Sequence, residues 1–258
     1  MNNRKVVLEL EHVSKSFAKI ETDEVTQAIS EISSTMESGE FISLVGPSGC
    51  GKSTILRLGA GLIMPTTGKV TVNSEEITNT SPDRGMVFQK PTLFPWLTVE
   101  KNIAFSLNMQ GRFKDNKDRV EEMISLIGLE NFRDDYPSQL SGGMAQRVAL
   151  VRTLINEPEI LLLDEPFGAL DAFTRMNMQD ELLKMWQKQQ QLALMVTHDV
   201  DEAIYMGTRV LVMDSSPGYI VDDIKIDKNF NGDRSSSVFA AYRKDILRKL
   251  NFSGRSVE

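Results

Sequence analysis

Apolar residues follow two different patterns in the parts of the chain that predict strands. Residues 6–10 and 25–32 alternate apolar and polar positions, which predicts antiparallel strands with one exposed face. Residues 41–45, 160–164 and 192–197 are short apolar runs of the kind found in strands buried on both faces of a parallel sheet. Further short strands are expected at residues 69–72, 86–88 and 209–213.

Helical periodicity fills the segments between these runs. Helices are expected at residues 52–62, 99–109, 117–127, 142–155, 173–190, 200–206 and 238–250. Alternating strands and helices predict an α/β fold, with a mainly parallel sheet core and an antiparallel strand region at the N-terminus. Because residues 90–156 have mainly helical signals, they predict a helical subdomain inserted into a domain of residues 1–228. Residues 229–258 are expected to form a linker and a short C-terminal helix.

Composition excludes several classes of protein. The chain has 258 residues, 41% of them hydrophobic, and a net charge of −7, so it lacks the overall positive charge that would attract nucleic acid. Its one cysteine, Cys50, cannot build a disulfide framework or a cysteine-based zinc site. No apolar run approaches the roughly 20 residues of a membrane-spanning helix, and acidic residues stand where a signal peptide would be apolar. We therefore expect a cytoplasmic protein that only a partner would hold at a membrane.

A glycine-rich loop between a predicted strand and a predicted helix carries the strongest chemical signal. It fits the pattern G-x-x-x-x-G-K-[ST] with Gly46, Pro47, Ser48, Gly49, Cys50, Gly51, Lys52 and Ser53, followed by Thr54. Such a loop directs backbone N–H groups at a phosphate chain, and the helix that follows adds its positive dipole end. Lys52 would reach the β- and γ-phosphates, and Ser53 would bind Mg²⁺. The alternative is a glycine-rich turn without a ligand.

Polar residues also follow three other predicted strands. Asp164 and Glu165 end the run at residues 160–164, Gln89 follows residues 86–88, and His198 follows residues 192–197. Parallel sheets bind ligands outside the carboxyl ends of their strands, so these side chains are expected at one edge with the loop. Asp164 suits Mg²⁺, and Glu165 could accept a proton from an attacking water. The alternatives are a solvated pair of acids and a structural histidine.

A second anion-binding pattern lies farther along the chain. Ser141, Gly142 and Gly143 precede a predicted helix that contains Gln146. Ser141 can cap that helix, and the glycines leave backbone N–H groups open. Taken alone, a cap and turn explains this pattern; together with the first loop, it suggests half of a phosphate site completed by another chain.

These motifs, in this order, resemble the nucleotide-binding subunits of ABC transporters. The resemblance rests on the loop at residues 46–53, Gln89, the signature at residues 140–146, residues 160–165, residues 168–171 and His198. Residues 87–105 are similar to the nitrate, sulfonate and taurine importer branch. The resemblance implies a P-loop NTPase fold, ATP and Mg²⁺ as ligands, and import of a small anion. It also implies a membrane permease and an extracytoplasmic binding protein as partners, with the chain peripheral on the inner face of the membrane.

The resemblance assigns further roles to individual residues. It implies a head-to-tail dimer, with a second copy of this chain the expected partner, in which the signature contacts the partner's ATP and Asp171 reaches across the interface. Gln89 would sense Mg²⁺ and the water, with Glu165 and His198 as the other catalytic residues. Phe17 stands where an aromatic residue stacks on adenine, although a core phenylalanine is the alternative.

An unusually apolar loop follows Gln89. It contains Phe94, Trp96 and Leu97, which we expect to form the docking surface for the permease. The alternative is that these side chains pack the helical subdomain onto the core.

Other ATPase classes fit the sequence less well. Soluble ABC ATPases that act on DNA interrupt the cassette with long coiled coils, and residues 53–140 have no sustained heptad pattern. Translation-associated members carry two cassettes in one chain, and a small-molecule kinase would lack the signature. Export remains an alternative to import.

Overall fold

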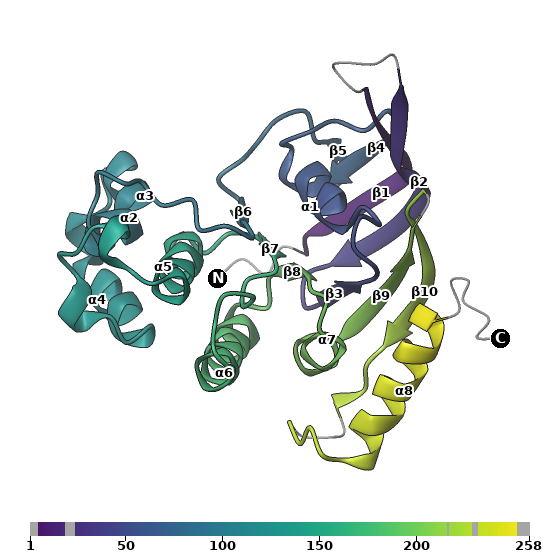
Figure 1. Cartoon of the computed structure of the whole chain (residues 1–258). Helices are drawn as coiled ribbons and strands as arrows, with labels where there is room; N and C mark the ends of the chain where they lie inside the picture. The colour runs from purple at the N-terminus through teal and green to yellow at the C-terminus, as the bar shows by residue number, and fades with distance from the viewer. Residues whose placement is uncertain (1–4, 19–23, 216, 229–231, 252–258) are drawn as a thin grey trace.

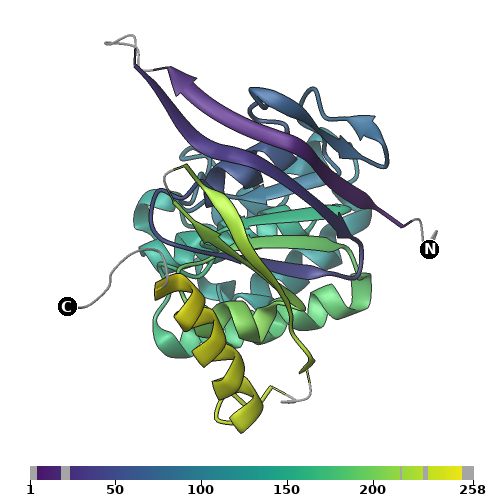
Figure 2. The same ribbon diagram turned by 90° about the vertical axis from the view of Figure 1, so that its right-hand side faces the viewer.

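A computed structural model describes residues 5–18, 24–215, 217–228 and 232–251, and arranges them around two sheets (Figures 1 and 2). The larger sheet has six strands in the order β10-β9-β3-β8-β7-β6. These are β10 (Tyr219–Lys225), β9 (Arg209–Asp214), β3 (Phe41–Val45), β8 (Leu192–Val196), β7 (Ile160–Asp164) and β6 (Arg84–Val87). All neighbouring pairs are parallel except β10 with β9.

The smaller sheet is antiparallel and comes from the N-terminal part of the chain. It contains β2 (Val25–Glu37), β1 (Val7–Ala18), β4 (Thr67–Val72) and β5 (Glu75–Glu76) in that order. Figure 2 shows its long strands crossing in front of the larger sheet. The mainly parallel core and the antiparallel N-terminal region are therefore both confirmed.

Eight α-helices connect or cover the strands of the described chain. They are α1 (Lys52–Ala60), α2 (Val99–Ile103), α3 (Phe105–Met109), α4 (Lys117–Leu126), α5 (Gly142–Leu154), α6 (Ala172–Gln189), α7 (Val200–Met206) and α8 (Ser237–Asn251). Short 3₁₀ turns lie at Lys114–Asn116, Glu130–Phe132 and Pro137–Gln139. Helices α2 to α5 follow β6, precede β7 and gather at one side of the molecule (Figure 1).

The larger sheet buries apolar side chains on both faces. In β7, Ile160 and Leu162 belong to a core that also contains α1 and the antiparallel sheet. Leu161 and Leu163 point the other way, into a core shared with α5 and α6. This two-sided burial explains why the strand is a continuous apolar run instead of an alternating one. It also places α1 and α5 on opposite faces of the same strand.

Several elements differ from the sequence predictions. β10 was not predicted, because its inward side chains are only partly buried and Asp222 and Asp223 have low strand propensity. The helix expected at residues 99–109 is divided at Ala104, where Phe105 turns onto Phe94 with ring centroids 4.3 Å apart. β1 and β2 run several residues beyond their predicted ends, because each strand continues to pair past irregularities in the register.

The chain ends lie partly outside the described residues. Positions 1–4, 229–231 and 252–258 are among those not described, so the expected linker is described only from Gly232 onward. The C-terminal helix is present as α8 and packs against α7 and β9. In the described part of the chain, no helix is both long enough and apolar enough to span a membrane.

Candidate active site

The glycine-rich loop joins β3 to α1 at the carboxyl edge of the larger sheet. Gly49 and Gly51 have φ angles of 82° and 87°, a left-handed conformation that glycine adopts at least cost. A Cβ atom on Gly46 would lie 2.6 Å from the carbonyl oxygen of Met213, so the loop also requires close backbone contact there. Gly51 provides no capping side chain, which leaves the first N–H groups of α1 as donors for an anion.

The Lys52 side chain lies inside the curve of this loop. Its Nζ donates hydrogen bonds to the carbonyl oxygens of Gly46 and Pro47 at 2.8 and 2.9 Å. Cys50 is buried beside it, and burial raises the pKa of its thiol although the Lys52 charge opposes this shift. The thiol is therefore protonated at neutral pH and serves as a packing group. Pro47, Ser48 and Gly49 form the exposed rim of the loop.

Ser53 and Asp164 provide a set of oxygen atoms that suits Mg²⁺. Ser53 Oγ, in the first turn of α1, donates a hydrogen bond to Asp164 Oδ1 at 2.9 Å. Burial raises the pKa of Asp164, while the Ser53 hydrogen bond acts in the opposite direction. Among the described residues, no group of three or more His, Cys, Asp or Glu side chains could hold a metal by itself. One hydroxyl and one carboxylate match Mg²⁺, which keeps waters and binds phosphate oxygens as its other ligands.

Glu165 contacts two other residues that the sequence predicted for the site. Its Oε2 accepts a hydrogen bond from Gln89 Nε2 at 3.1 Å and lies 3.4 Å from His198 Nδ1. The backbone of Glu165 has a φ of 47°, which is costly for a residue other than glycine, and its N–H donates to Val196. This turn directs Glu165 away from Asp164, so one carboxylate faces Ser53 and the other faces Gln89 and His198. A carboxylate in this position can accept a proton from a bound water.

The second anion-binding motif starts α5. Ser141 caps the helix by accepting a hydrogen bond from the N–H of Met144 at 3.2 Å, and both Ser141 and Gly142 are exposed. A Cβ atom on Gly143 would lie 3.2 Å from the carbonyl oxygen of Ala169. The motif is thus next to the loop at residues 168–171 of its own chain. Because α1 and α5 pack on opposite faces of β7, their N-termini do not share one anion site within a chain.

Gln146 differs from the prediction for the signature. Its side chain is only 1% exposed, and its Nε2 donates to the carbonyl oxygen of Phe88 at 3.2 Å. It therefore faces its own chain between α5 and the end of β6, and it cannot contact a partner's nucleotide directly. The physical reason is helical periodicity, because Gln146 lies on the inward face of α5 while Ser141 and Gly142 precede that face.

Asp171 and the following helix connect the 168–171 loop to the His198 region. Asp171 caps α6 by accepting from the N–H of Thr174 at 3.0 Å. Hydrogen bonds from the Thr174 side chain and from this N–H lower the pKa of the exposed Asp171 carboxyl. Arg175, one turn later, donates to the carbonyl oxygen of Leu170 at 3.1 Å and lies 3.7 Å from Asp199. Arg175 was not identified from the sequence. Its position one turn into the helix after Asp171 was the only feature that could have indicated it.

Phe17 lies on the strand pair that borders the glycine-rich loop. Its side chain is 41% exposed, which excludes a fully buried core position, and Lys15 Nζ lies 5.1 Å from its ring centroid. Lys15 pairs with Ile29 of β2, and a Cβ atom on Gly51 would touch Ile29 at 2.8 Å. An exposed aromatic face beside a phosphate loop can stack on a base.

The apolar loop after Gln89 is held in shape by Asn102, a buried residue that sequence reasoning did not identify. The Asn102 amide donates to the carbonyl oxygens of Phe94, Leu97 and Thr98 and accepts from the N–H of Phe94, all within 2.9–3.2 Å. Phe94 and Leu97 are partly buried, whereas Trp96 is 69% exposed. Phe94 therefore packs inward, as the packing alternative predicts, whereas Trp96 is exposed, and its role in docking stays a prediction.

A pocket of about 390 Å³ lies beside this loop. Its lining includes Thr92, Phe94, Phe105 and Arg152, and Arg152 holds the loop by donating to Thr92 O at 2.8 Å. Three further lining residues have a buried polar atom without a hydrogen-bond partner among the described residues: Arg84 Nε, Ser106 Oγ and Asn156 Oδ1. Burying such atoms without a hydrogen bond costs free energy.

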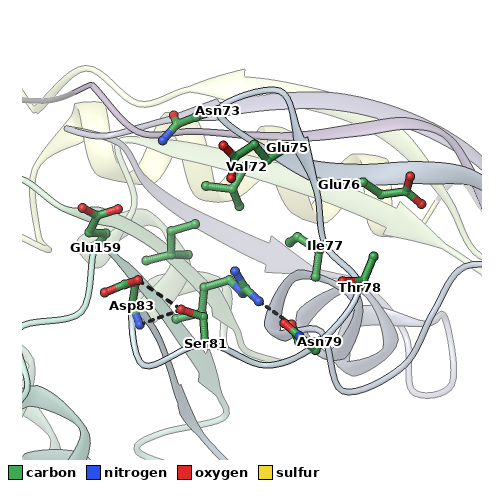
Figure 3. Close-up of a pocket in the computed structure, with 12 residues that line it drawn as sticks. Val72, Asn73, Glu75, Glu76, Ile77, Thr78, Asn79, Ser81, Asp83 and Glu159 are labelled. Atoms are coloured by element: carbon green, nitrogen blue, oxygen red, sulfur yellow. Dashed lines mark hydrogen bonds between the residues drawn. The ribbon is translucent and has the colours of Figure 1, made fainter.

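Another pocket, of about 380 Å³, lies at the opposite edge of the sheet (Figure 3). It is lined by Glu75, Glu76 and Glu159 and by the beginnings of β6 and β7, at Arg84 and Ile160. Asp164 is the last residue of β7, and Gln89 and Glu165 follow the ends of β6 and β7. The pocket and the candidate site therefore lie at opposite ends of strands β6 and β7.

Comparison with known proteins places these motifs in a family. The family model described as "ABC transporter" matches residues 29–168. An uncharacterized ABC transporter ATP-binding protein of Methanocaldococcus jannaschii is 48% identical over 247 residues, covering 95% of this chain and 92% of that protein. The aliphatic sulfonates import ATP-binding protein SsuB of Bacillus cereus is 42% identical over 249 residues, covering 96% and 98%.

A solved structure extends the likeness to the fold. The dimeric structure of a post-hydrolysis state of an ATP-binding cassette, bound to ADP and Pi, superposes with a TM-score of 0.78. It is 31% identical to this chain and covers 85% of this chain and 99% of its own.

Proposed function

The chain belongs to the ABC transporter family as an ATP-hydrolysing, ATP-binding subunit, and from this premise we propose that it powers the import of a small sulfonate-like anion. One observation carries the choice of cargo. Over 96% of its length the chain is 42% identical to a subunit named for aliphatic sulfonate import. Nitrate is a compact anion and taurine carries a sulfonate group, so both belong to the same class of candidate cargo.

The chemical step is the hydrolysis of ATP to ADP and phosphate in the presence of Mg²⁺. Lys52 and the N-terminus of α1 would bind the phosphate chain, and Ser53, Asp164 and Gln89 would hold the metal ion. Mg²⁺ supplies charge neutralisation at the β- and γ-phosphates. Glu165 accepts the proton of the attacking water, and His198 and Gln89 orient its carboxylate. Phe17 stacks on the adenine.

Each ATP site is completed by a second subunit. The signature residues Ser141, Gly142 and Gly143 are exposed or partly exposed at the start of α5, on the face of β7 opposite α1. A head-to-tail dimer brings the signature of one copy to the glycine-rich loop of the other, with Asp171 beside it. The permease binds the loop containing Phe94, Trp96 and Leu97, and delivers cargo from an extracytoplasmic binding protein.

Reconstitution with the cognate membrane subunits and binding protein tests the cargo. We expect an alkanesulfonate, taurine or nitrate to stimulate ATP hydrolysis in proteoliposomes and to accumulate on the side opposite the binding protein. Citrate, a bulkier anion, is the control and should do neither. Stimulation by none of the three small anions, or movement of the cargo toward the binding-protein side, contradicts the proposal.

Truncating Trp96 should weaken assembly with the permease. An aromatic anchor at the centre of an interface commonly contributes about 2 kcal/mol or more, so Trp96→Ala is expected to lower affinity about thirtyfold. Because the indole is largely exposed, the melting temperature and ATP affinity of the isolated subunit should stay close to wild type. Co-purification with the permease measures the loss.

Val25→Ala is the matched control for this experiment. Val25 is another exposed apolar residue, at 66%, and lies on β2 in the antiparallel sheet. It should assemble normally. A Trp96→Ala protein that assembles like wild type, or that melts much earlier, would show that the indole packs the subdomain instead of docking the permease.

A further inference from the structure

A hydrogen-bond network of polar side chains connects the C-terminal segment to the His198 region. Arg234, just before α8, donates to Gln179 Oε1 on α6 at 2.5 Å. Gln179 Nε2 donates in turn to Glu202 Oε1 on α7 at 2.8 Å. Glu202 also forms a hydrogen bond with Thr197, the residue immediately before His198. Gln179 and Glu202 are both buried, so this network passes through the protein interior.

Arg234 fixes the direction in which hydrogen bonds are donated along this network. A guanidinium can only donate hydrogen bonds and an ionised carboxylate can only accept them, so the Gln179 amide has one orientation that satisfies both neighbours. Burial raises the pKa of Glu202, and the hydrogen bonds from Thr197 and Gln179 oppose that shift. Without Arg234, the Gln179 oxygen would lose its donor, and a rotated amide would present an oxygen to the Glu202 carboxylate. The amide oxygen and the carboxylate would repel each other, so the side chains would have to rearrange.

The network reaches the backbone on both sides of His198. Thr197 Oγ1 accepts from the N–H of Asp199 at 3.0 Å, and Asp199 Oδ1 accepts from the N–H of Glu202 at 3.2 Å. His198 therefore lies in a turn whose flanking residues are both tied to Glu202. A shift of Glu202 would be transmitted to the ring that faces Glu165.

The C-terminal segment is firmly attached to the same region. Phe239 and Ile246 of α8 are fully buried in a core with Ala203 and Ile204 of α7. The Arg234 guanidinium also lies 3.8 Å from the ring centroid of Tyr205, at the end of α7. Figure 1 shows α8 alongside β10, with α7 between it and α6. Arg234 is thus held between two helices whose first residues follow Asp171 and Asp199.

We propose that Arg234 is a positioning residue for ATP hydrolysis, which acts through Gln179 and Glu202 to hold His198 against Glu165. The C-terminal segment is then part of the catalytic apparatus of this chain. This inference rests on the proposed role of His198 in hydrolysis.

Steady-state kinetics of the full-length chain test the inference. Arg234→Gln is expected to lower kcat about tenfold, because a displaced group costs rate even when the substituted residue is far from the chemistry. KM for ATP should stay unchanged, since the network does not touch the glycine-rich loop or Phe17. Arg234→Lys, which keeps a cationic donor, should recover most of the rate.

Glu202→Gln provides the second arm. Alone it should lower kcat by a similar factor, and combined with Arg234→Gln it should add little, because both substitutions break one connected network. Arg243→Gln is the matched control: Arg243 lies on α8 and pairs with Asp201 on the exposed side of α7, outside the network. It should keep wild-type kcat.

Several results would overturn the inference. A normal kcat for Arg234→Gln, or for Glu202→Gln should the first variant not fold, excludes a positioning role. Effects that multiply in the double variant, or an equal loss in Arg243→Gln, would assign the defect to general packing of α8. His198→Ala is measured in the same assay: if it retains wild-type kcat, the proposed role of His198 has failed, whereas a slow His198→Ala beside a normal Arg234→Gln overturns this inference alone.

Discussion

Glu165→Gln should lower the rate of ATP hydrolysis by about 10²–10⁴-fold while ATP still binds. A general base contributes about that factor, equivalent to roughly 3–5 kcal/mol of activation free energy. An amide has the shape of the carboxylate and can still accept the Gln89 hydrogen bond, so the fold and the local geometry should be retained. The variant should therefore accumulate as an ATP-bound dimer. Single-turnover hydrolysis and gel filtration with ATP measure these two effects.

Asp164→Asn is the matched control, because it makes the same chemical change at the adjacent residue. Asp164 faces Ser53 on the side proposed for Mg²⁺, so this variant should require more Mg²⁺ and bind Mg-ATP more weakly. Adding His198→Ala to Glu165→Gln should cost little further rate, because the two side chains act as a unit. Near wild-type turnover by Glu165→Gln would disprove the assignment of the base.

Mixing two inactive variants should restore ATP hydrolysis. Lys52→Ala removes the cation from the glycine-rich loop, and Ser141→Arg blocks the exposed start of α5. In a head-to-tail mixed dimer, one site contains both defects and the other contains neither. Random assortment of equal amounts should therefore yield about a quarter of the wild-type activity when each intact site works independently. The measurement is ATPase activity across a series of mixing ratios.

Ser141→Thr is the control for the signature arm of this experiment. Threonine keeps the hydroxyl and can cap α5, so this variant should remain active by itself. Wild-type activity of Ser141→Arg alone, or no recovery at any ratio of the two inactive chains, would contradict a composite site. The first result would exclude a role for the signature, and the second would favour complete sites within one chain.

Local sequence was sufficient for the elements whose signals are contiguous. The loop at residues 46–53 requires glycines at fixed spacing between a buried strand and a helix, and the structure has β3, Gly49 and Gly51 in the expected conformations. Ser141 was predicted as a helix cap from its own residue type and the glycines that follow it, and it caps α5. The alternation of strands and helices likewise predicted the parallel sheet. Each of these features depends on backbone preferences that act over a few residues.

The structure differs from the sequence predictions where the local sequence signals are weak. β10 is an edge strand with two adjacent aspartates, so its pattern resembles a loop. Gln146 belongs to a motif whose other members are exposed or partly exposed. Only the packing of α5 onto β6 and the core shows that the Gln146 side chain points inward. Asn102 looks like any polar residue of an amphipathic helix until its four hydrogen bonds to the apolar loop are seen.

The sequence by itself therefore determined the fold class, the phosphate loop and the family resemblance, because these depend on short-range order and residue spacing. Only the tertiary structure decided which distant residues meet. Gln89 and Glu165 are 76 positions apart and come within hydrogen-bonding distance because β6 and β7 are neighbours in the sheet. The opposite placement of α1 and α5, and the path from Arg234 to Thr197, depend on how helices pack across that sheet. Such contacts arise from the burial of apolar faces over the whole chain, which no local pattern specifies.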